Sequence, residues 1–447
     1  MAIISASTPV HRRGLLLFGL SLGYFLVLLD TTVVTVALPA IGAGLGGGLA
    51  SLQWVSNAYT LTFAALLLTA GAWSDRYGAR RVFLIGLWCF AVLSAASAFA
   101  GSTGVLVGLR ALLGIAGALL VPTSLALIAG SCSAPAERAR AMGVWAALSG
   151  AGLVAGPVVG GLLTDAFGWQ AIFLVNVPFA LAAVMIAVRL APETARATGR
   201  GTDVTGQVSA VVALAGLTYG LVQAGPLGWA APEVLVALAV SVTGAVVFVR
   251  AQRREAAMLP LSLFRSRTFS LGLVAGVVVN FGLSGVLFVL SLRFQATWHL
   301  SPAAAGLAFL PLTIPTAVNP IFTGRLVARV GPRAPAVAGM AAMAAGTAVQ
   351  AWAGDQVVVA LAGLALLGAG VSFAVPALVT AVVGAVPPAQ AGVGSGAVNS
   401  ARQTGAVLGV AVLGTVAGSP SGTGAALVVA AAVLLAGAAV PCGLEPR

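Results

Sequence analysis

Residues 14–38 read GLLLFGLSLGYFLVLLDTTVVTVAL, an apolar stretch that contains one charged side chain, Asp30. A helix needs about 20 mostly apolar residues to cross the hydrocarbon core of a bilayer. The stretch therefore predicts a membrane-spanning helix with a carboxylate inside it. Arg12 and Arg13 precede it, so a twin-arginine signal peptide is an alternative. The stretch is longer than the apolar region of a signal peptide and contains the acid Asp30. We therefore expect it to be retained as the first membrane helix.

The same pattern recurs along the chain and predicts an all-α integral membrane protein with 14 transmembrane helices. The whole chain agrees, because 60% of its 447 residues are apolar and only 7% are charged, against about 25% in soluble proteins. The other expected spans lie near 52–72, 82–100, 104–130, 141–163, 170–188, 204–224, 232–249, 269–292, 302–323, 334–353, 356–383, 393–417 and 423–440.

The charged residues predict the orientation. The net charge is +12 and every basic residue is Arg, yet the charges lie between apolar stretches and form no patch typical of nucleic-acid binding. Positive residues favour cytoplasmic loops, so we expect both termini in the cytoplasm and the chain in the cytoplasmic (inner) membrane. This orientation leaves Arg293 as the one basic residue in an outer loop. The expected inner loops then hold Arg76, Arg80, Arg81, Arg138, Arg140, Arg189, Arg196, Arg200, Arg250, Arg253, Arg254, Arg265, Arg267, Arg325, Arg329 and Arg333.

Two inner loops share a spacing that indicates an internal repeat. Gly71, Asp75, Arg76, Gly78 and Arg80 follow the second span, and Gly324, Ala328, Arg329, Gly331 and Arg333 follow the tenth. A duplicated bundle explains the match. We therefore predict a six-helix bundle in 1–200, a two-helix insertion in 201–254 and a second six-helix bundle in 255–447.

Several kinds of chemistry are disfavoured by composition. A Walker A loop needs a Lys, which the sequence lacks. The two His and three Cys residues show no metal-ligand spacing, and no G-x-S-x-G elbow occurs. We expect neither an enzyme nor a metal or organic cofactor. Transport would then run on an ion gradient or downhill.

Three charged residues lie inside expected spans: Asp30, Arg110 and Arg402. Ionisable groups are costly in a membrane and commonly functional. Asp30 is a candidate proton carrier with Arg110 as its partner; the alternative is a fixed structural contact. Arg402 is either a functional polar site or a side chain that reaches the inner interface.

Four motifs resemble those of the fourteen-helix drug:proton antiporters of the major facilitator superfamily. They are LDTTVVTVALP at 29–39, GAWSDRYGARR at 71–81, Arg110 followed by Gly114, and GLVAGPVVGG at 152–161. The resemblance implies a fold of two six-helix bundles plus two inserted helices. It also implies proton coupling at Asp30 and Arg110.

The resemblance assigns two further groups. Gly71, Asp75, Arg76, Gly78 and Arg80 would form a conformational latch between the bundles. Gly152, Gly156, Pro157, Gly160 and Gly161 would form the motif that is associated with exporters. Glycines four apart also permit close helix packing.

A substrate cavity between the bundles is also implied. The candidate lining residues are Tyr24, Phe25, Asn280, Phe281, Phe288 and Phe373. Because no second acid lies deep in a span, we expect neutral, zwitterionic or singly charged lipophilic substrates rather than dications. Drug export, export of one endogenous metabolite, import and a non-transporting sensor are the competing functions. We expect a monomer whose partners are substrate, protons and membrane lipids, with no nucleic acid.

Overall fold

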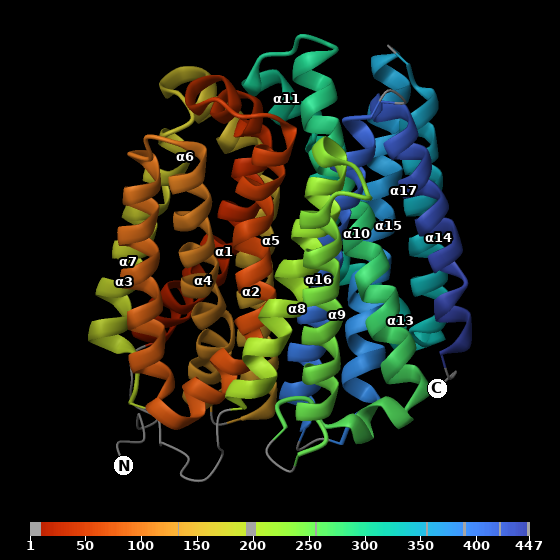
Figure 1. Ribbon diagram of the computed structural model, residues 1–447. Coiled ribbons are helices and arrows are strands. Elements are labelled where there is room, and N and C mark those ends of the chain that lie inside the picture. The colour runs from red at the N-terminus through yellow and green to blue at the C-terminus, as the bar shows by residue number, and fades with distance from the viewer. Residues whose placement is uncertain are drawn as a thin grey trace.

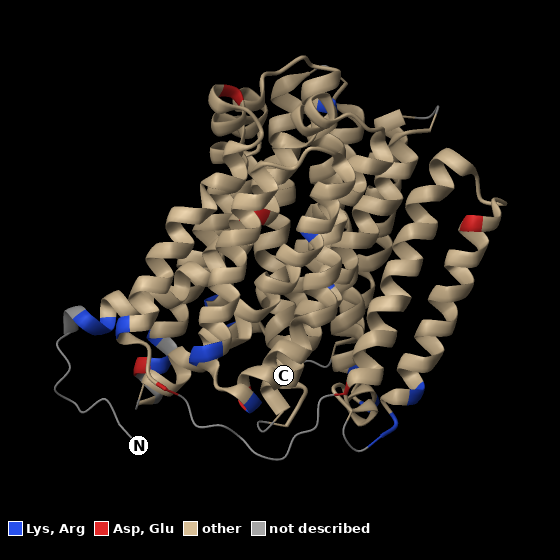
Figure 2. Ribbon diagram, turned by 60° about the vertical axis from the view of Figure 1, so that its left-hand side comes forward, with Lys and Arg blue, Asp and Glu red and all other residues tan. Residues whose placement is uncertain are grey.

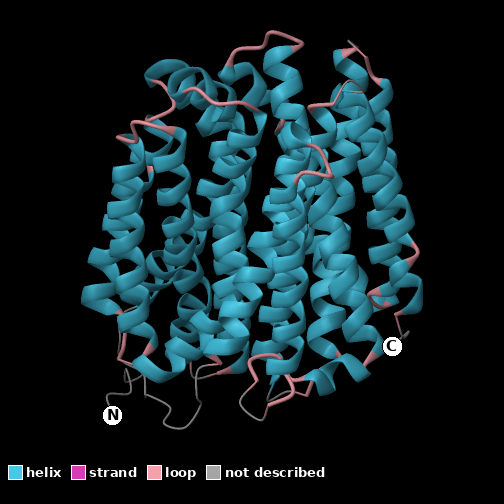
Figure 3. Ribbon diagram, viewed as in Figure 1, coloured by secondary structure: helices cyan, strands magenta, loops and turns pink. Residues whose placement is uncertain are grey.

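The computed structural model describes residues 10–132, 134–193, 203–254, 257–354, 356–387, 390–419 and 422–444. These residues form helices and no strand (Figure 3). The helices stand side by side and run between the two ends of the molecule. The predicted all-α class is confirmed.

The N-terminal helices pack into one bundle. Its central helix, α1, packs against α4, α5 and α7, while α2 packs against α4. Short polar or Gly-containing turns separate the members. The helices are α1 (Val10–Leu45), α2 (Leu49–Tyr77), α3 (Ala79–Ala98), α4 (Thr103–Ser131), α5 (Pro135–Phe167), α6 (Ala171–Leu174) and α7 (Asn176–Leu190).

The C-terminal helices form a second bundle around α10, which packs against α15, α16 and α17. Its helices are α10 (Arg267–Ala296), α11 (Pro302–Ala308), α12 (Leu310–Val318), α13 (Pro320–Val330), α14 (Arg333–Trp352), α15 (Val357–Gly384), α16 (Ala391–Ala417) and α17 (Gly422–Ala438). Two 3₁₀ helices flank them, η1 (Leu261–Arg265) and η3 (Val440–Gly443).

Helices α8 (Val204–Leu227) and α9 (Pro232–Ala251) form a hairpin beside the junction of the bundles (Figure 1). Helix α8 contacts α2 of the first bundle and α16 of the second. The Gln207 side-chain amide donates to the Ala65 carbonyl at 2.8 Å. The Thr415 hydroxyl donates to the Leu221 carbonyl at 3.0 Å. The hairpin is thus attached to both bundles through α8.

Helix α1 begins and α17 ends at the same end of the molecule (Figure 1), which we name the terminal end. The opposite end is named the far end. Basic residues gather at the terminal end (Figure 2). They lie at helix starts and ends, for example Arg76 and Arg189 in the last turns of α2 and α7. The described arginines of the expected inner loops therefore lie at one end of the fold, while Arg196 and Arg200 lie outside the described residues.

Twelve helices of the described residues are long and apolar enough to cross a membrane. Two of the fourteen expected spans are not among them. One is 393–417, which corresponds to α16. The other is 302–323, which forms the three short helices α11, α12 and α13 instead of a single helix. Proline has no backbone N–H and interrupts a helical ladder. Pro311 and Pro320 lie in the first turns of α12 and α13.

The prediction for Arg293 is wrong. This residue lies in the last turn of α10, where its side chain is buried. Its guanidinium donates to the Gln350 carbonyl at 2.9 Å and to the Gly354 carbonyl at 2.5 Å. Backbone carbonyls at the end of α14 stabilise a cation that apolar patterning alone assigns to a loop.

Candidate functional site

Asp30, Arg110 and Asn176 meet inside the N-terminal bundle. They come from the middle of α1, the first third of α4 and the first residue of α7. Arg110 forms an ion pair with one carboxylate oxygen of Asp30. The Asn176 amide donates to the other oxygen at 3.1 Å. All three side chains are at most 1% exposed, so the acid is sealed from solvent in this conformation.

Arg110 is held by more than its counter-ion. Its Nε donates to the Val55 carbonyl of α2 at 3.2 Å. Its guanidinium carbon lies 4.5 Å from the centre of the Tyr59 ring, a cation–π contact. Gly114, one turn further along α4, makes this approach possible, because a Cβ there would collide with the Tyr59 carbonyl. The Arg-Gly pair in the sequence therefore sets how closely α4 packs on α2.

Asn176 and Ser94 belong to the network, and sequence reasoning missed both. The Asn176 amide also donates to the Ser94 hydroxyl at 3.1 Å, and that hydroxyl donates to the Phe173 carbonyl at 3.0 Å. The Asn176 Oδ1 atom has no partner among the described residues. An amide carries both donors and an acceptor. By rotating, this side chain can bind Asp30 either as a carboxylate or as a carboxylic acid.

The predicted antiporter motif on α5 packs against both bundles. A Cβ at Gly152 would come within 2.6 Å of the Phe25 carbonyl of α1, and one at Gly160 within 2.6 Å of the Val33 carbonyl. A Cβ at Gly156 would collide with Thr32 of α1. The glycines four apart thus give α1 and α5 their close contact.

The end of the same motif reaches the C-terminal bundle. A Cβ at Gly161 would collide with the Pro302 carbonyl of α11. In the reverse direction, a Cβ at Gly306 would collide with the Pro157 carbonyl of α5. We name these four residues the far-end interlock, since they join the bundles in the far half of α5.

The predicted latch residues lie at the terminal end. Asp75 and Arg76 are exposed in the last turn of α2 and form no ion pair within the described part of the chain. Arg80 forms an ion pair with Glu193 of its own bundle. Gly71 lies earlier in α2. Within the described residues, no ion pair joins the predicted latch to the second bundle.

The internal repeat has the same backbone geometry in both copies. Gly78 ends α2 with φ +92° and Gly331 ends α13 with φ +77°, values that favour glycine. Their N–H groups donate to the carbonyls of Ser74 and Val327, at 3.0 and 2.9 Å. Gly168 and Gly228 end α5 and α8 in the same way, so this turn is shared by several helices of the described chain.

The six residues predicted for the cavity separate into different environments. Tyr24 stacks on Trp145 of α5, with ring centres 4.7 Å apart, and Asn280 accepts a hydrogen bond from Arg402 at 3.1 Å. Phe25 packs against Phe179 of α7. The other three candidates are phenylalanines, whose side chains cannot form conventional hydrogen bonds. Phe288 is fully buried in the hydrophobic core, whereas Phe281 and Phe373 are half-buried.

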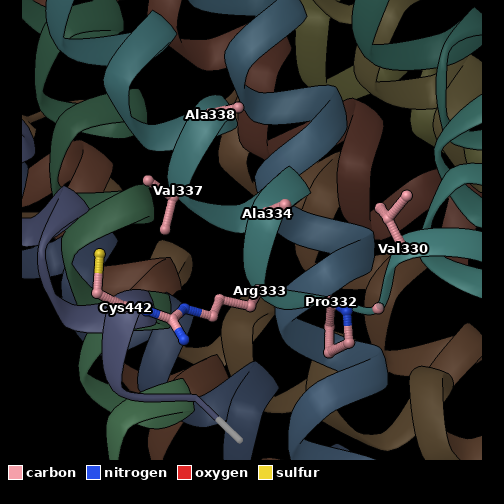
Figure 4. A pocket seen from close by; sticks show the side chains of 8 residues that line it. Val330, Pro332, Arg333, Ala334, Val337, Ala338 and Cys442 are labelled. Atoms are coloured by element: carbon pink, nitrogen blue, oxygen red, sulfur yellow. The ribbon is translucent and has the colours of Figure 1, made fainter. Parts of the chain in front are cut away.

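A shallow pocket lies elsewhere, at the terminal end of the C-terminal bundle (Figure 4). The turn between α13 and α14 and the residue Cys442 line it, and the Arg333 side chain extends toward Cys442. None of the predicted site residues belongs to its lining. It is separate from the junction of the bundles.

The chain matches the Major Facilitator Superfamily over residues 20–410 and 272–446. It is 33% identical over 410 residues to the multidrug resistance protein Stp of Mycobacterium tuberculosis, covering 91% of this chain and 76% of that protein. It is 36% identical over 415 residues to the tetracenomycin C resistance and export protein of Streptomyces glaucescens, with the same coverage.

A third relative and two solved structures extend the comparison. The methylenomycin A resistance protein of Streptomyces coelicolor is 36% identical over 429 residues, which cover 93% of this chain and 89% of that protein. A D-xylose-proton symporter superposes with a TM-score of 0.72 at 15% identity, over 97% of this chain and 98% of its own. The human organic anion transporter MFSD10 superposes with a TM-score of 0.66 at 20% identity, over 97% and 100%. These two structures show the shared fold.

Proposed function

Because the chain belongs to the Major Facilitator Superfamily, and its relatives are named for drug resistance and export, we propose that it exports small lipophilic drugs or antibiotics in exchange for protons. The identity of 33–36% extends over more than nine-tenths of the chain. The names of the relatives support the direction of transport. The proton as the coupling ion rests on the buried site.

The observation that carries the proposal is the enclosed Asp30–Arg110 pair. A buried ion pair adds little net stability compared with apolar packing, so its presence calls for another role. A proton on Asp30 would remove the negative charge that holds Arg110. The cation would then be held by the Val55 carbonyl and by the rings of Tyr59 and Phe173. Protonation would in this way loosen the joint between α1, α2 and α4.

The loosening would be coupled to alternating access through the contacts between the bundles. The Ser291 hydroxyl donates to the Thr35 carbonyl at 2.7 Å, and the Gln295 amide donates to the Val36 carbonyl at 2.8 Å. Both bonds join α10 to the far half of α1, beside the far-end interlock. Toward the terminal end the bundles meet through α2 and α16, where the Ser400 hydroxyl donates to the Ala64 carbonyl at 3.0 Å, whereas α13 packs on α12, α14 and α15 of its own bundle. This pattern fits a conformation that is closed at the far end and opens at the terminal end.

The same proposal includes the finer topology. Helix α16 and the broken stretch α11–α13 would cross the membrane together with the twelve apolar helices, which gives fourteen crossings. The bundles would be 1–200 and 255–447, with α8 and α9 as the inserted pair. The Arg-rich terminal end would face the cytoplasm. Asp75 and Arg76 would engage the second bundle when the terminal end closes.

The test is transport by the full-length protein in liposomes with an imposed pH gradient. Movement of lipophilic dyes and antibiotics is compared between the wild type, Asp30→Asn and Asp165→Asn. Asp165 is an exposed acid at the far end and serves as the matched control. We expect gradient-driven movement in the wild type and the control, and its loss in Asp30→Asn. Full activity of Asp30→Asn would rule out Asp30 as the proton carrier.

Export of a single endogenous metabolite is the second candidate. Two of the relatives are named for resistance to one antibiotic each, tetracenomycin C and methylenomycin A. A protein of this kind would move one compound of a chemically broad panel. A multidrug exporter would move several unrelated members of the panel.

A further inference from the structure

Arg402 is a charged residue of the fold that the proton site does not use. It lies on α16, eleven residues after that helix begins at the terminal end. Its Nε donates to Asn280 Oδ1 at 3.1 Å, and its Nη1 donates to Asn399 Oδ1 at 3.4 Å. Both partners are neutral amides. Among the described residues, no carboxylate forms an ion pair with it.

Arg402 differs from Arg110 in lacking an ion-paired carboxylate among the described residues. Arg110 is 1% exposed and has the Asp30 carboxylate as its counter-ion. Arg402 is held in position by amide oxygens but keeps its full charge, and its side chain is partly exposed. A cation inside a membrane protein is costly unless an anion or water meets it. An arginine that is fixed, reachable and without a counter-ion is suited to bind an anionic group of a ligand.

The surroundings of Arg402 add an aromatic surface from the other bundle. Tyr24 of α1 lies close enough to Arg402 for the two to interact electrostatically. Tyr24 stacks on Trp145 of α5, with an angle of 22° between the rings. The Trp145 ring is fixed in turn, because its Nε1 donates to the Ser124 hydroxyl at 3.1 Å.

These groups lie at a similar depth. Tyr24, Trp145, Asn280 and Arg402 are each 10 to 14 residues from the start of a helix that begins at the terminal end. They come from both bundles, α1 and α5 on one side and α10 and α16 on the other. Asp30 lies six residues beyond Tyr24, about 9 Å further along α1 at 1.5 Å per residue. The arrangement is therefore separate from the proton site.

We propose that Arg402 binds an acidic group of the substrate, held in place by Asn280 and Asn399, while the Tyr24–Trp145 pair contacts its aromatic or apolar body. The substrate class is a lipophilic monoanion, for example an aromatic carboxylic acid. This assignment rests on the proposed export function and deepens it. It narrows the expected neutral, zwitterionic or singly charged substrates to those with one negative charge.

The test measures binding to the full-length protein in nanodiscs of zwitterionic phosphatidylcholine, by calorimetry and without a pH gradient. The probes are 2-naphthoate and 2-naphthamide, which share their ring system and differ in charge. A charge-assisted pair should make the carboxylate bind about ten-fold more tightly than the amide. Arg402→Gln should abolish this preference and leave the affinity for the amide unchanged.

Two further variants keep the test decisive. Arg402→Lys keeps the charge without the planar fork of guanidinium donors and should retain part of the preference, so it replaces Arg402→Gln if that variant does not fold. Arg329→Gln removes an exposed arginine at the terminal end and should keep the full preference. Equal affinity of the wild type for both probes, or no measurable binding of naphthoate, would overturn the assignment. So would a preference that survives Arg402→Gln.

The binding assay is independent of proton exchange. If the naphthoate preference is absent but Asp30 is needed for gradient-driven movement, the export proposal stands and the Arg402 assignment fails. If the naphthoate preference is present but Asp30→Asn transports normally, the assignment of Asp30 as the proton carrier fails instead.

Discussion

Asn176 and Arg110 bind the Asp30 carboxylate from different helices, one on each oxygen. The amide donor of Asn176 lies 3.1 Å from Oδ1, and the Arg110 guanidinium contacts Oδ2. The acid of α1 is thereby tied to α4 and α7 together. Its protonation would weaken the ties to both helices.

Asn176→Ala should destabilise the protein and slow gradient-driven transport. It removes a hydrogen bond to a charged acceptor, which contributes about 1.5–3 kcal/mol. Thermal unfolding in detergent measures the first effect, and the liposome assay measures the second. Asn57→Ala is the matched control, because Asn57 is also buried but neither of its side-chain polar atoms has a partner in the described chain. Equal destabilisation by both variants would show that the Asn176 bond adds nothing.

Replacing one partner of the Asp30–Arg110 pair should lower the free energy of unfolding more than replacing both partners together. A single variant leaves a buried charge without its counter-ion, which costs about 3–5 kcal/mol. Unfolding free energies of Asp30→Asn, Arg110→Gln and the double variant form the cycle that measures the coupling. In the control variant Glu193→Gln, an exposed pair is broken, and the expected loss is below about 1 kcal/mol. Additive single effects would mean that the pair is not coupled.

Gly161→Ala should open the far end. The added methyl group collides with the Pro302 carbonyl when the bundles are joined there, and such overpacking costs about 1–3 kcal/mol. The readout is the rate of thiol labelling of Ser291→Cys in a cysteine-free background, since Ser291 is fully buried at the far-end contact. About a ten-fold rise in labelling corresponds to 1.4 kcal/mol.

The same helix provides the control for the Gly161 experiment. A Cβ at Gly150 would meet no atom of a neighbouring helix within 4 Å. Gly150→Ala should therefore leave the labelling rate unchanged. A Gly161→Ala protein that labels no faster than Gly150→Ala would show that the interlock does not control the far end.

Gly78→Ala and Gly331→Ala should destabilise the two bundles to a similar extent. Both glycines have positive φ, a conformation that costs a residue with a side chain about 1–2 kcal/mol. Gly324→Ala is the control, because a Cβ there has open space and the backbone is helical. Melting temperatures measured in detergent check the prediction. An unchanged melting temperature for Gly78→Ala would contradict the strained turn.

The sequence was sufficient to identify the charged members of the site and insufficient for its neutral ones. Asp30 and Arg110 are easily recognised because no other residue of their expected spans is charged. Asn176 lies two residues before Pro178, near the expected start of a span, where a polar residue is unremarkable. Its role depends on α6 and α7 turning it toward α1, which no local pattern encodes. Ser94 is similar, since a serine in a membrane helix usually bonds its own backbone.

The placement of the aromatic residues could not be predicted for a different reason. A helix that is apolar on every side carries no periodic signal that tells which face meets a neighbour. Phe288 and Phe281 were therefore indistinguishable from Tyr24 as cavity candidates, although Phe288 is fully buried in the core. The stretch 302–323 contains several prolines. Because membrane helices tolerate proline, these residues alone do not predict three separate helices.

Binding of an anion at Arg402, which forms no ion pair within the described residues, would also have an electrical consequence. Exchange of one inward proton for one outward monoanion would transfer two elementary charges per cycle across the membrane. Each charge contributes about 2.3 kcal/mol per 100 mV of membrane voltage. Such a pump would keep working on voltage alone after the pH difference had collapsed, which an exchanger of protons for monocations could not do.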